Sequence, residues 1–132
     1  MAKSALYTAN TTSTALTADS SVPVGSTIRR YGKCIQTSGS SVALLEPGYY
    51  LVNASATLSP TAAGTVFITG QKDGVSVPGA TASETVAAAA ATANLALTFI
   101  VRNPCCNSSV LSFVMGGAES TMTNFAVTVE KL

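Results

Sequence analysis

The chain of 132 residues contains no histidine and few charged residues, with seven Lys or Arg and six Asp or Glu. The absence of histidine removes the commonest general base and every nucleophile that depends on a Ser-His or Cys-His pair. The six acids fall almost entirely in turns or at the ends of predicted strands, where charged side chains ordinarily face water. A phosphate-binding loop is also absent, because Gly116-Gly117 is not followed by Lys and Ser or Thr. The sequence therefore predicts a protein that is not an enzyme and needs no cofactor.

Cysteine is scarce as well, with Cys34, Cys105 and Cys106 forming an odd set. The first residues carry no apolar run typical of a secretory signal, so we expect reduced thiols in a protein made in the cytosol. Structural zinc takes four ligands, and three cysteines without histidine do not supply them. We therefore predict no metal site, with a site shared around a symmetry axis as the remaining alternative. The adjacent Cys105-Cys106 pair is interpreted as two small loop residues rather than a redox centre.

Net charge gives the chain no strong attraction to polyanions. The formal charge is +1, and no apolar run is long enough to span a bilayer. One basic cluster occurs, Arg29, Arg30 and Lys33 around Tyr31, and it is too short to indicate nucleic-acid binding. We interpret it as a solvated strand edge or loop, and we predict neither a nucleic-acid nor a membrane partner.

The low charge points instead to protein contacts. Charged residues make up 10% of the chain and apolar residues 47%, while most of the polar remainder is Ser, Thr, Asn and Gly. One explanation is a β-protein whose many Ser and Thr side chains face solvent. The other, which we favour, is an obligate oligomer whose subunits cover one another's apolar surface.

The stretch from Glu46 to Leu58 organises the rest of the chain. Pro47-Gly48 ends what precedes it, and strict alternation then predicts a strand with two distinct faces. The core face holds Tyr50, Val52, Ala54, Ala56 and Leu58, and the other face holds Tyr49, Leu51, Asn53, Ser55 and Thr57. Because the second face combines large apolar with small polar residues, we predict that Tyr49, Leu51 and Asn53 lie in an interface between subunits.

The remaining residues predict a single all-β domain over 1–132. About eight to ten short strands are separated by turn signals at a spacing of roughly 8 to 12 residues, which is typical of a sandwich or jelly roll. Asp73-Gly74 predicts a tight hairpin, and Pro78-Gly79 is expected to end the short strand that leaves it. Residues 87–91 are all Ala and favour helix, but the Thr-rich flanks and the lack of charge around them indicate strand at both ends, with the Ala run as strand or loop.

The N-terminal 21 residues allow two interpretations. Residues 4–10 alternate weakly, and residues 10–21 are nearly all Thr, Ser and Ala, which we expect to be too polar for the core. Leu6 and Tyr7 are apolar enough to dock, so this segment is a candidate contact with a larger support that becomes ordered on binding. Alternatively, residues 4–10 are the first strand of the sheet and the loop after them is a surface connection.

The order of motifs resembles the TNF-like jelly-roll superfamily, which includes the globular heads of the first complement component and collagen-like surface proteins of bacterial spores. The matching residues are Pro47, Gly48, Tyr50 and Val52, then Asp73, Gly74, Val77, Pro78 and Gly79, then Val127, Val129, Glu130 and Lys131. The resemblance implies a ten-strand sandwich that assembles as a compact homotrimer, with Tyr49 and Leu51 near the three-fold axis. No collagen repeat or heptad precedes the domain, so we expect it to stand alone or attach through its first residues. No acidic cluster matches the calcium sites of some members.

A trimeric, charge-poor jelly roll without a stalk leads to a functional expectation. We expect the chain to be a non-enzymatic structural protein of the virion, namely a bacteriophage head-decoration or head-fibre protein. Its expected partners are its own copies and a capsid or other virion protein. Two alternatives stay open: the receptor- or glycan-binding tip of a phage fibre, with a host surface glycan as ligand, and a bacterial spore-coat or surface protein.

Overall fold

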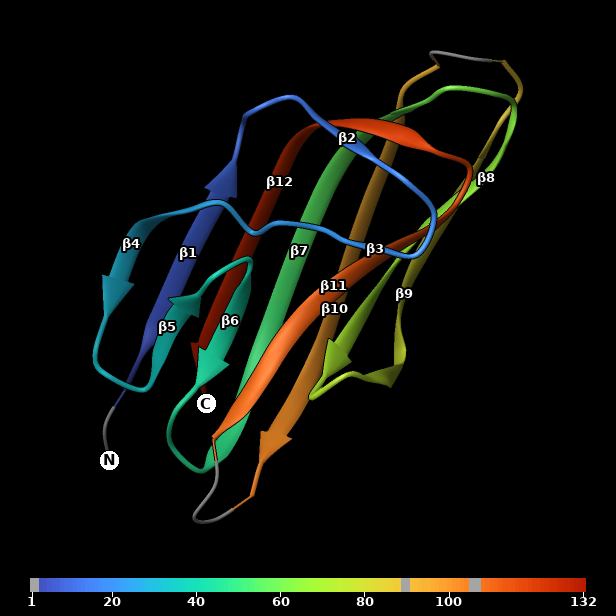
Figure 1. Cartoon of the computed structure of the whole chain (residues 1–132). Helices are drawn as coiled ribbons and strands as arrows, with labels where there is room; N and C mark the ends of the chain where they lie inside the picture. The colour runs from blue at the N-terminus through green and yellow to red at the C-terminus, as the bar shows by residue number, and fades with distance from the viewer. Residues whose placement is uncertain (1–2, 89–90, 105–107) are drawn as a thin grey trace.

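A computed structural model describes residues 3–88, 91–104 and 108–132, and it shows an all-β sandwich of two antiparallel sheets (Figure 1). The predicted all-β sandwich is confirmed, but the described residues form twelve strands rather than about ten short ones, because short pieces such as β2 and β3 also pair and four strands exceed ten residues. The strands are β1 (Ala5–Asn10), β2 (Thr14–Leu16), β3 (Ser20–Ser21), β4 (Ser26–Tyr31), β5 (Ile35–Ser38), β6 (Ser41–Leu44), β7 (Gly48–Pro60), β8 (Gly64–Lys72), β9 (Val75–Val86), β10 (Ala93–Asn103), β11 (Ser109–Gly117) and β12 (Ser120–Lys131).

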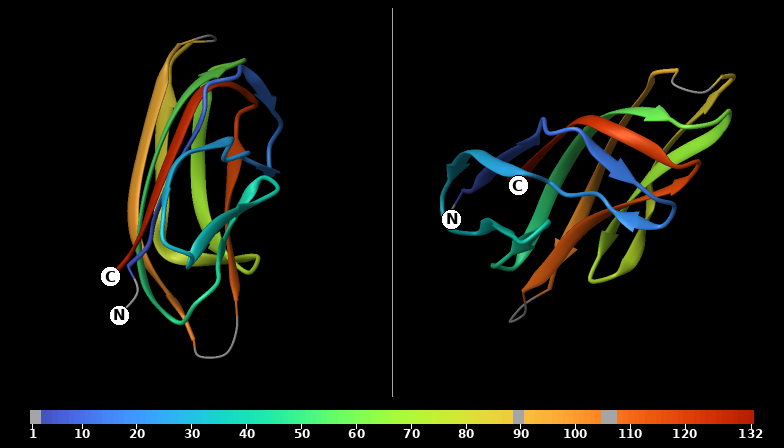
Figure 2. Two further views of the ribbon diagram at one scale, coloured as in Figure 1. Left: turned by 90° about the vertical axis from the view of Figure 1, so that its left-hand side faces the viewer. Right: turned by 45° about the horizontal axis from the view of Figure 1, so that its top comes forward.

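Each sheet joins strands that are distant in the sequence. The first sheet has the order β10-β7-β12-β1-β4, with β2 also paired to β12. The second has the order β5-β6-β11-β8-β9, with β3 also paired to β11. Seen edge-on, the two sheets form two layers, and the start of β1 and the end of β12 lie at one end of the sandwich (Figure 2). The amide of Lys131 donates to the carbonyl oxygen of Ser4 at 2.9 Å, which places the two terminal segments side by side.

The inward-facing side chains of alternate strand residues fill the space between the sheets. Tyr50, Val52 and Leu58 of β7 are completely buried, which confirms the core face predicted for this strand. Three phenylalanines join the layers, because Phe113 of β11 meets Phe99 of β10 at 6.2 Å and Phe125 of β12 at 5.3 Å between ring centroids, both edge to face. Such aromatic pairs add to the stabilisation from buried area alone. The core is therefore continuous from the β10 edge to the centre of the first sheet.

The strand that follows the Asp73-Gly74 hairpin is longer than predicted. Pro78-Gly79 does not end it, since β9 continues to Val86 and pairs with β8 beyond a register shift between Thr69 and Gln71. β9 is the edge of its sheet, where a proline costs no ladder hydrogen bond on the solvent side. The positive φ of 81° at Gly79 accommodates the irregularity. The hairpin itself has positive φ at both Asp73 and Gly74, as the dipeptide predicts.

The prediction that residues 10–21 are too polar for the core is wrong for one residue. Leu16 is 5% exposed, and its strand β2 pairs with the first residues of β12. The backbone of the small polar residues around Leu16 is satisfied by hydrogen bonding to β12. One buried leucine is therefore enough to anchor the segment. The strands predicted on either side of the Ala run are confirmed, since β9 ends at Val86 and β10 begins at Ala93. Residues 89–90 of the run lie outside the described residues.

Candidate functional site

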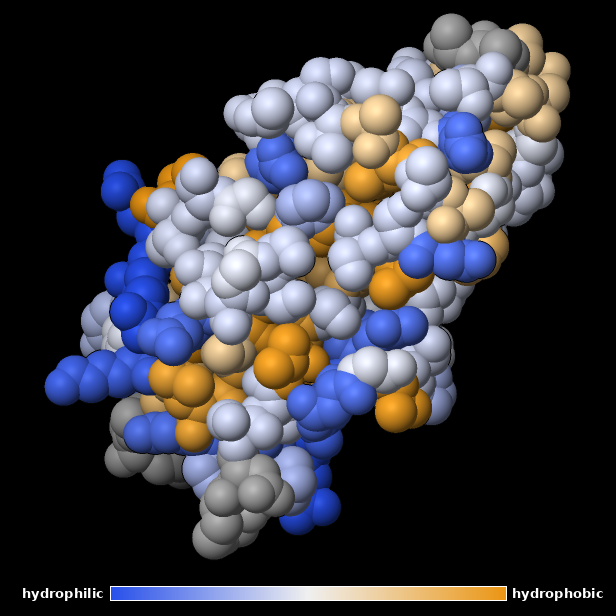
Figure 3. Space-filling view, viewed as in Figure 1, coloured by the Kyte–Doolittle hydropathy of each residue, from blue (hydrophilic) through white to orange (hydrophobic). Residues whose placement is uncertain are grey.

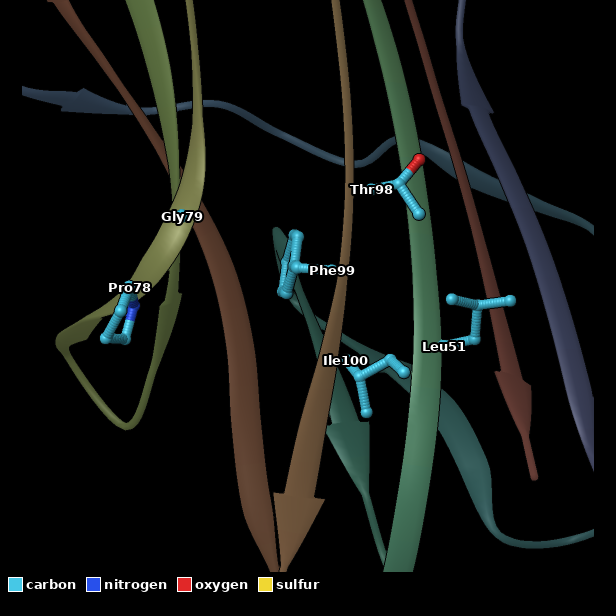
Figure 4. Close-up of a pocket in the computed structure, with 6 residues that line it drawn as sticks. All are labelled: Leu51, Pro78, Gly79, Thr98, Phe99 and Ile100. Carbon is cyan, nitrogen blue, oxygen red and sulfur yellow. The ribbon is translucent and has the colours of Figure 1, made fainter.

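The outer face of the first sheet brings the predicted interface residues together. Cross-strand pairing sets Leu51 of β7 between Ile100 of β10 and Glu130 of β12. The next row sets Asn53 between Thr98 and Thr128. Since residues paired across antiparallel strands point to the same side, these side chains form one surface. Figure 4 shows Leu51, Thr98 and Ile100 on neighbouring strands of this face.

Exposure agrees with the predicted faces of β7. Tyr49 is 54% exposed, Asn53 is exposed and Leu51 is half-buried. Sequence reasoning missed Ile100, which is also 54% exposed and pairs directly with Leu51. The signal was present, because Ile100 occupies an outward position in a strand whose inward residues alternate strictly. We call Tyr49, Leu51, Asn53 and Ile100 the apolar face.

A shallow groove extends this face beyond the edge of the sheet. It is lined by Leu51, Thr98, Phe99 and Ile100 together with Pro78-Gly79 of β9, which belongs to the other sheet (Figure 4). The groove therefore runs from the centre of the apolar face across the free edge of β10. Its lining contains no charged residue and offers side-chain hydrogen bonding only through Thr98, so it suits an apolar protein surface.

The outer face of the second sheet has a different composition. Thr65 and Thr85 hydrogen-bond at 2.9 Å between their hydroxyl oxygens, and Thr69 and Thr81 do so at 3.2 Å. Figure 3 looks onto this side of the molecule, and weakly polar residues cover much of it, with orange patches between them. Ser and Thr ladders of this kind are compatible with water. Both outer faces mix polar and apolar side chains, and the first sheet's is the one on which Leu51 and Ile100 pair directly beside the exposed Tyr49.

The two residues predicted to contact a support are placed differently. Leu6 is 1% exposed and packs in the core, whereas Tyr7 is 39% exposed on the outer face. β1 lies inside the first sheet between β12 and β4, so Leu6 is held on both sides. This corrects the prediction for Leu6, whose side chain has no surface to offer a support in the folded chain. The contact remains a prediction for Tyr7 alone.

No protein-family model and no curated protein matches the chain. Several solved structures do match over nearly its full length. Murine APRIL is 14% identical with a TM-score of 0.76, covering 98% of this chain and 99% of its own. The globular domain of zebrafish complement 1qA is 10% identical with a TM-score of 0.70, covering 97% and 95%. The vertex protein P5 of PRD1 is 16% identical with a TM-score of 0.65, covering 98% and 96%.

The chain has a TNF-like jelly-roll fold. At these identities the likeness concerns the fold alone. The resemblance drawn from the motif order is thereby confirmed for the fold.

One end of the TNF-like jelly roll contains a partly buried polar network in which buried side chains meet the exposed Glu46. The hydroxyl of Tyr50 donates to the carbonyl oxygen of Glu46 at 2.6 Å, and the side-chain amide of Asn103 donates to the same oxygen at 2.9 Å. The thiol of Cys34 donates to the Glu46 carboxylate at 2.8 Å, and the Lys131 ammonium lies 3.9 Å from the same carboxylate oxygen. Burial is the largest factor that raises the pKa of Tyr50, and the neighbouring Cys34 contributes.

This network has the properties of a structural brace. Cys34 and Tyr50 are both completely buried, so neither the thiol nor the phenol can meet a substrate. Within the described ranges 3–88, 91–104 and 108–132, His, Cys, Asp and Glu form no group of three or more that could hold a metal ion. The same ranges contain no helix able to cross a membrane. Cys105 and Cys106 lie outside the described residues, so the interpretation of that pair remains a prediction.

Proposed function

We propose that this chain is a non-enzymatic structural protein of a bacteriophage virion, where it forms homotrimers that decorate or stabilise the particle. The observation that carries the proposal is the apolar face. Three large apolar side chains, Tyr49, Leu51 and Ile100, meet on the outer surface of the sheet, with Asn53 in the next row and the charged Arg102 and Glu130 paired across the strands from Tyr49 and Leu51. A surface of this kind is stabilised when another protein covers it.

The trimer follows from the face together with the fold. TNF-like folds typically form trimers, which supports burial of this sheet around a three-fold axis. The groove that crosses the edge of β10 continues the face toward Pro78-Gly79 of β9, which belongs to the other sheet. A three-fold contact needs two different surfaces on each subunit, because the face of one copy meets another part of the next. In the proposed trimer, the apolar face of one copy meets the Pro78-Gly79 side of the groove on the next copy.

The proposal that the chain belongs to a virion rests on its likeness to one phage protein. One structural neighbour over nearly the whole chain is a phage vertex protein, P5 of PRD1. The neutral, Ser/Thr-rich outer face of the second sheet suits a module that faces solvent on a particle. Attachment to a capsid or another virion protein is part of the proposal. The receptor- or glycan-binding tip and the spore-coat protein remain alternative predictions.

Sedimentation of two matched variants tests the assembly. Ile100→Glu places a carboxylate in the apolar face, and Val110→Glu makes the same kind of change at an exposed apolar position, 42% exposed, on the second sheet. We expect the wild type and Val110→Glu to sediment as trimers and Ile100→Glu as a monomer, because a desolvated unpaired charge is costly. A trimeric Ile100→Glu variant would refute the assigned interface. Co-sedimentation of the trimer with particles of the phage whose genome encodes the chain tests the virion role.

A further inference from the structure

The free edge of the first sheet carries a concentration of positive charge. β4 forms this edge, and all six of its residues are exposed. Arg29 and Arg30 lie within β4, Lys33 follows it, and Lys3 lies against the turn at Gly32. Four of the seven cationic residues of the chain are thus gathered on one strand and its end. We call β4 with Lys3 and Lys33 the basic edge; in Figure 1 it lies at the left margin of the sandwich.

This charge is not neutralised within the described chain. Among the described residues one ion pair occurs, between Lys131 and Glu46, and it involves none of the four cations. Four of the six acids lie elsewhere, at positions 19, 73, 84 and 119, which fall on β9, the β8–β9 turn and the loops before β3 and β12. Of the other two, Glu46 pairs with Lys131, and Glu130 lies on β12 beside Ala5 without an ion pair to any of the four cations. Arg30 makes one hydrogen bond, from Nε to the carbonyl oxygen of Ile35 at 2.8 Å, which holds the side chain without removing its charge.

β4 also has backbone groups available for pairing. It pairs with β1 on one side and with no described strand on the other, so its outward N–H and C=O groups have no strand partner. Edge strands of this type accept an additional extended strand. Charged residues often discourage such pairing between identical copies, since like charges would face each other. The same positive charges favour pairing with a strand whose side chains are negatively charged.

We infer that the basic edge binds an extended acidic segment of a partner protein, which adds as a strand to β4. Arg29 and Tyr31 project from the outer face of the sheet, beside Tyr7 and Ala5. Arg30 pairs with the inward-facing Leu6, so it projects from the opposite face toward β5. An acidic side chain of the added strand therefore meets an arginine on whichever face it lies. Ile28 and Tyr31, 46% and 68% exposed, offer apolar contacts beside the charges.

This inference goes beyond the proposed function and does not depend on the trimer. Its test uses the full chain and a short fluorescent synthetic peptide in which Glu and Val alternate, with a Lys-Val peptide and heparin as comparison ligands. Fluorescence anisotropy measures peptide binding, and hydrogen exchange measures protection of residues 26–31. Arg29→Gln combined with Lys33→Gln removes two charges that make no described hydrogen bond. Lys72→Gln combined with Arg102→Gln is the matched control away from β4.

We expect the Glu-Val peptide to bind and to slow exchange in β4, while the Lys-Val peptide does not bind. The Arg29 and Lys33 variant should bind about three- to tenfold more weakly, as for two surface charge pairs, and the control variant should bind like the wild type. Equal weakening in both variants, or binding without protection of β4, would overturn the inference. Binding to heparin without binding to the peptide would also overturn it, in favour of an anionic polysaccharide. Sedimentation of the same samples reports separately on the trimer.

Discussion

Replacement of Tyr50 tests how the base of the sandwich is held together. The side chain is completely buried in β7, and its hydroxyl donates to the carbonyl oxygen of Glu46 at 2.6 Å. Tyr50→Ala removes a ring from the core and leaves a cavity, which for large aromatic residues costs about 3 to 5 kcal/mol. Domains of this size have a free energy of unfolding of about 5 to 15 kcal/mol, so the variant should retain only part of its stability.

Tyr50→Phe separates the hydroxyl from the ring. The Glu46 carbonyl keeps its hydrogen bond from Asn103 at 2.9 Å, so it does not become unsatisfied. We therefore expect a loss of only about 0.5 to 1.5 kcal/mol, the usual net value of one hydrogen bond. Tyr49→Ala is the positional control, because its side chain is exposed on the opposite face of the same strand. It should leave the stability of a single subunit nearly unchanged and weaken assembly instead.

Urea denaturation followed by far-UV circular dichroism measures these differences. The three substitutions are best compared in the Ile100→Glu background, where dissociation does not contribute to the transition. The predicted order of destabilisation is Tyr50→Ala, then Tyr50→Phe, then Tyr49→Ala. Equal losses for Tyr49→Ala and Tyr50→Ala would refute the assignment of the two faces. A Tyr50→Phe loss as large as that of Tyr50→Ala would show that the hydroxyl, and not the ring, determines stability there.

Three further predictions concern the same fold. Burial raises the pKa of Tyr50 above its ordinary value of about 10, so the neutral phenol stabilises the fold fully below about pH 10 and this stabilisation is lost as the pH rises through the higher folded pKa. The urea midpoint of Tyr50→Phe should therefore fall less than that of the wild type under strong alkali. Gly70→Ala should destabilise by about 1 to 3 kcal/mol, because a Cβ there would lie 2.6 Å from the Phe99 ring; Phe99→Leu should relieve this in a double-mutant cycle, and additive losses would contradict the clash. Deletion of residues 1–8 should abolish folding, since β1 lies between β12 and β4; a folded, trimeric deletion variant would show that β1 is dispensable.

The two faces of the central strand could be predicted because alternation is a local signal. Tyr50 and Tyr49 are adjacent and chemically identical, yet the period of two places one in the core and the other on the surface. The hairpin at Asp73-Gly74 was equally predictable, since that dipeptide accepts positive φ. These features depend on neighbours in the sequence, and the fold class follows once enough of them are in order.

Features that depend on strand position were not predictable in this way. Pro78 is compatible with a strand only because β9 is an edge, and strand order is a tertiary property. Leu16 is buried because β2 meets β12 across more than a hundred residues of sequence. Ile100 joins Leu51 in the apolar face through the pairing of β10 with β7, so three of the four residues of this face could be predicted from the sequence and the strand register supplied the fourth.

The most direct measurement of the central claim compares thiol labelling on the two outer faces. Ser55→Cys lies on the outer face of the first sheet, and Ser112→Cys lies at a half-buried outward position on the second. Both are made with Cys105 and Cys106 replaced by Ser, and Cys34 is completely buried. If the first sheet packs around a three-fold axis, Ser112→Cys reacts rapidly with a bulky maleimide, and Ser55→Cys reacts only after the trimer dissociates. Equal rapid labelling of both in the native protein would contradict the account.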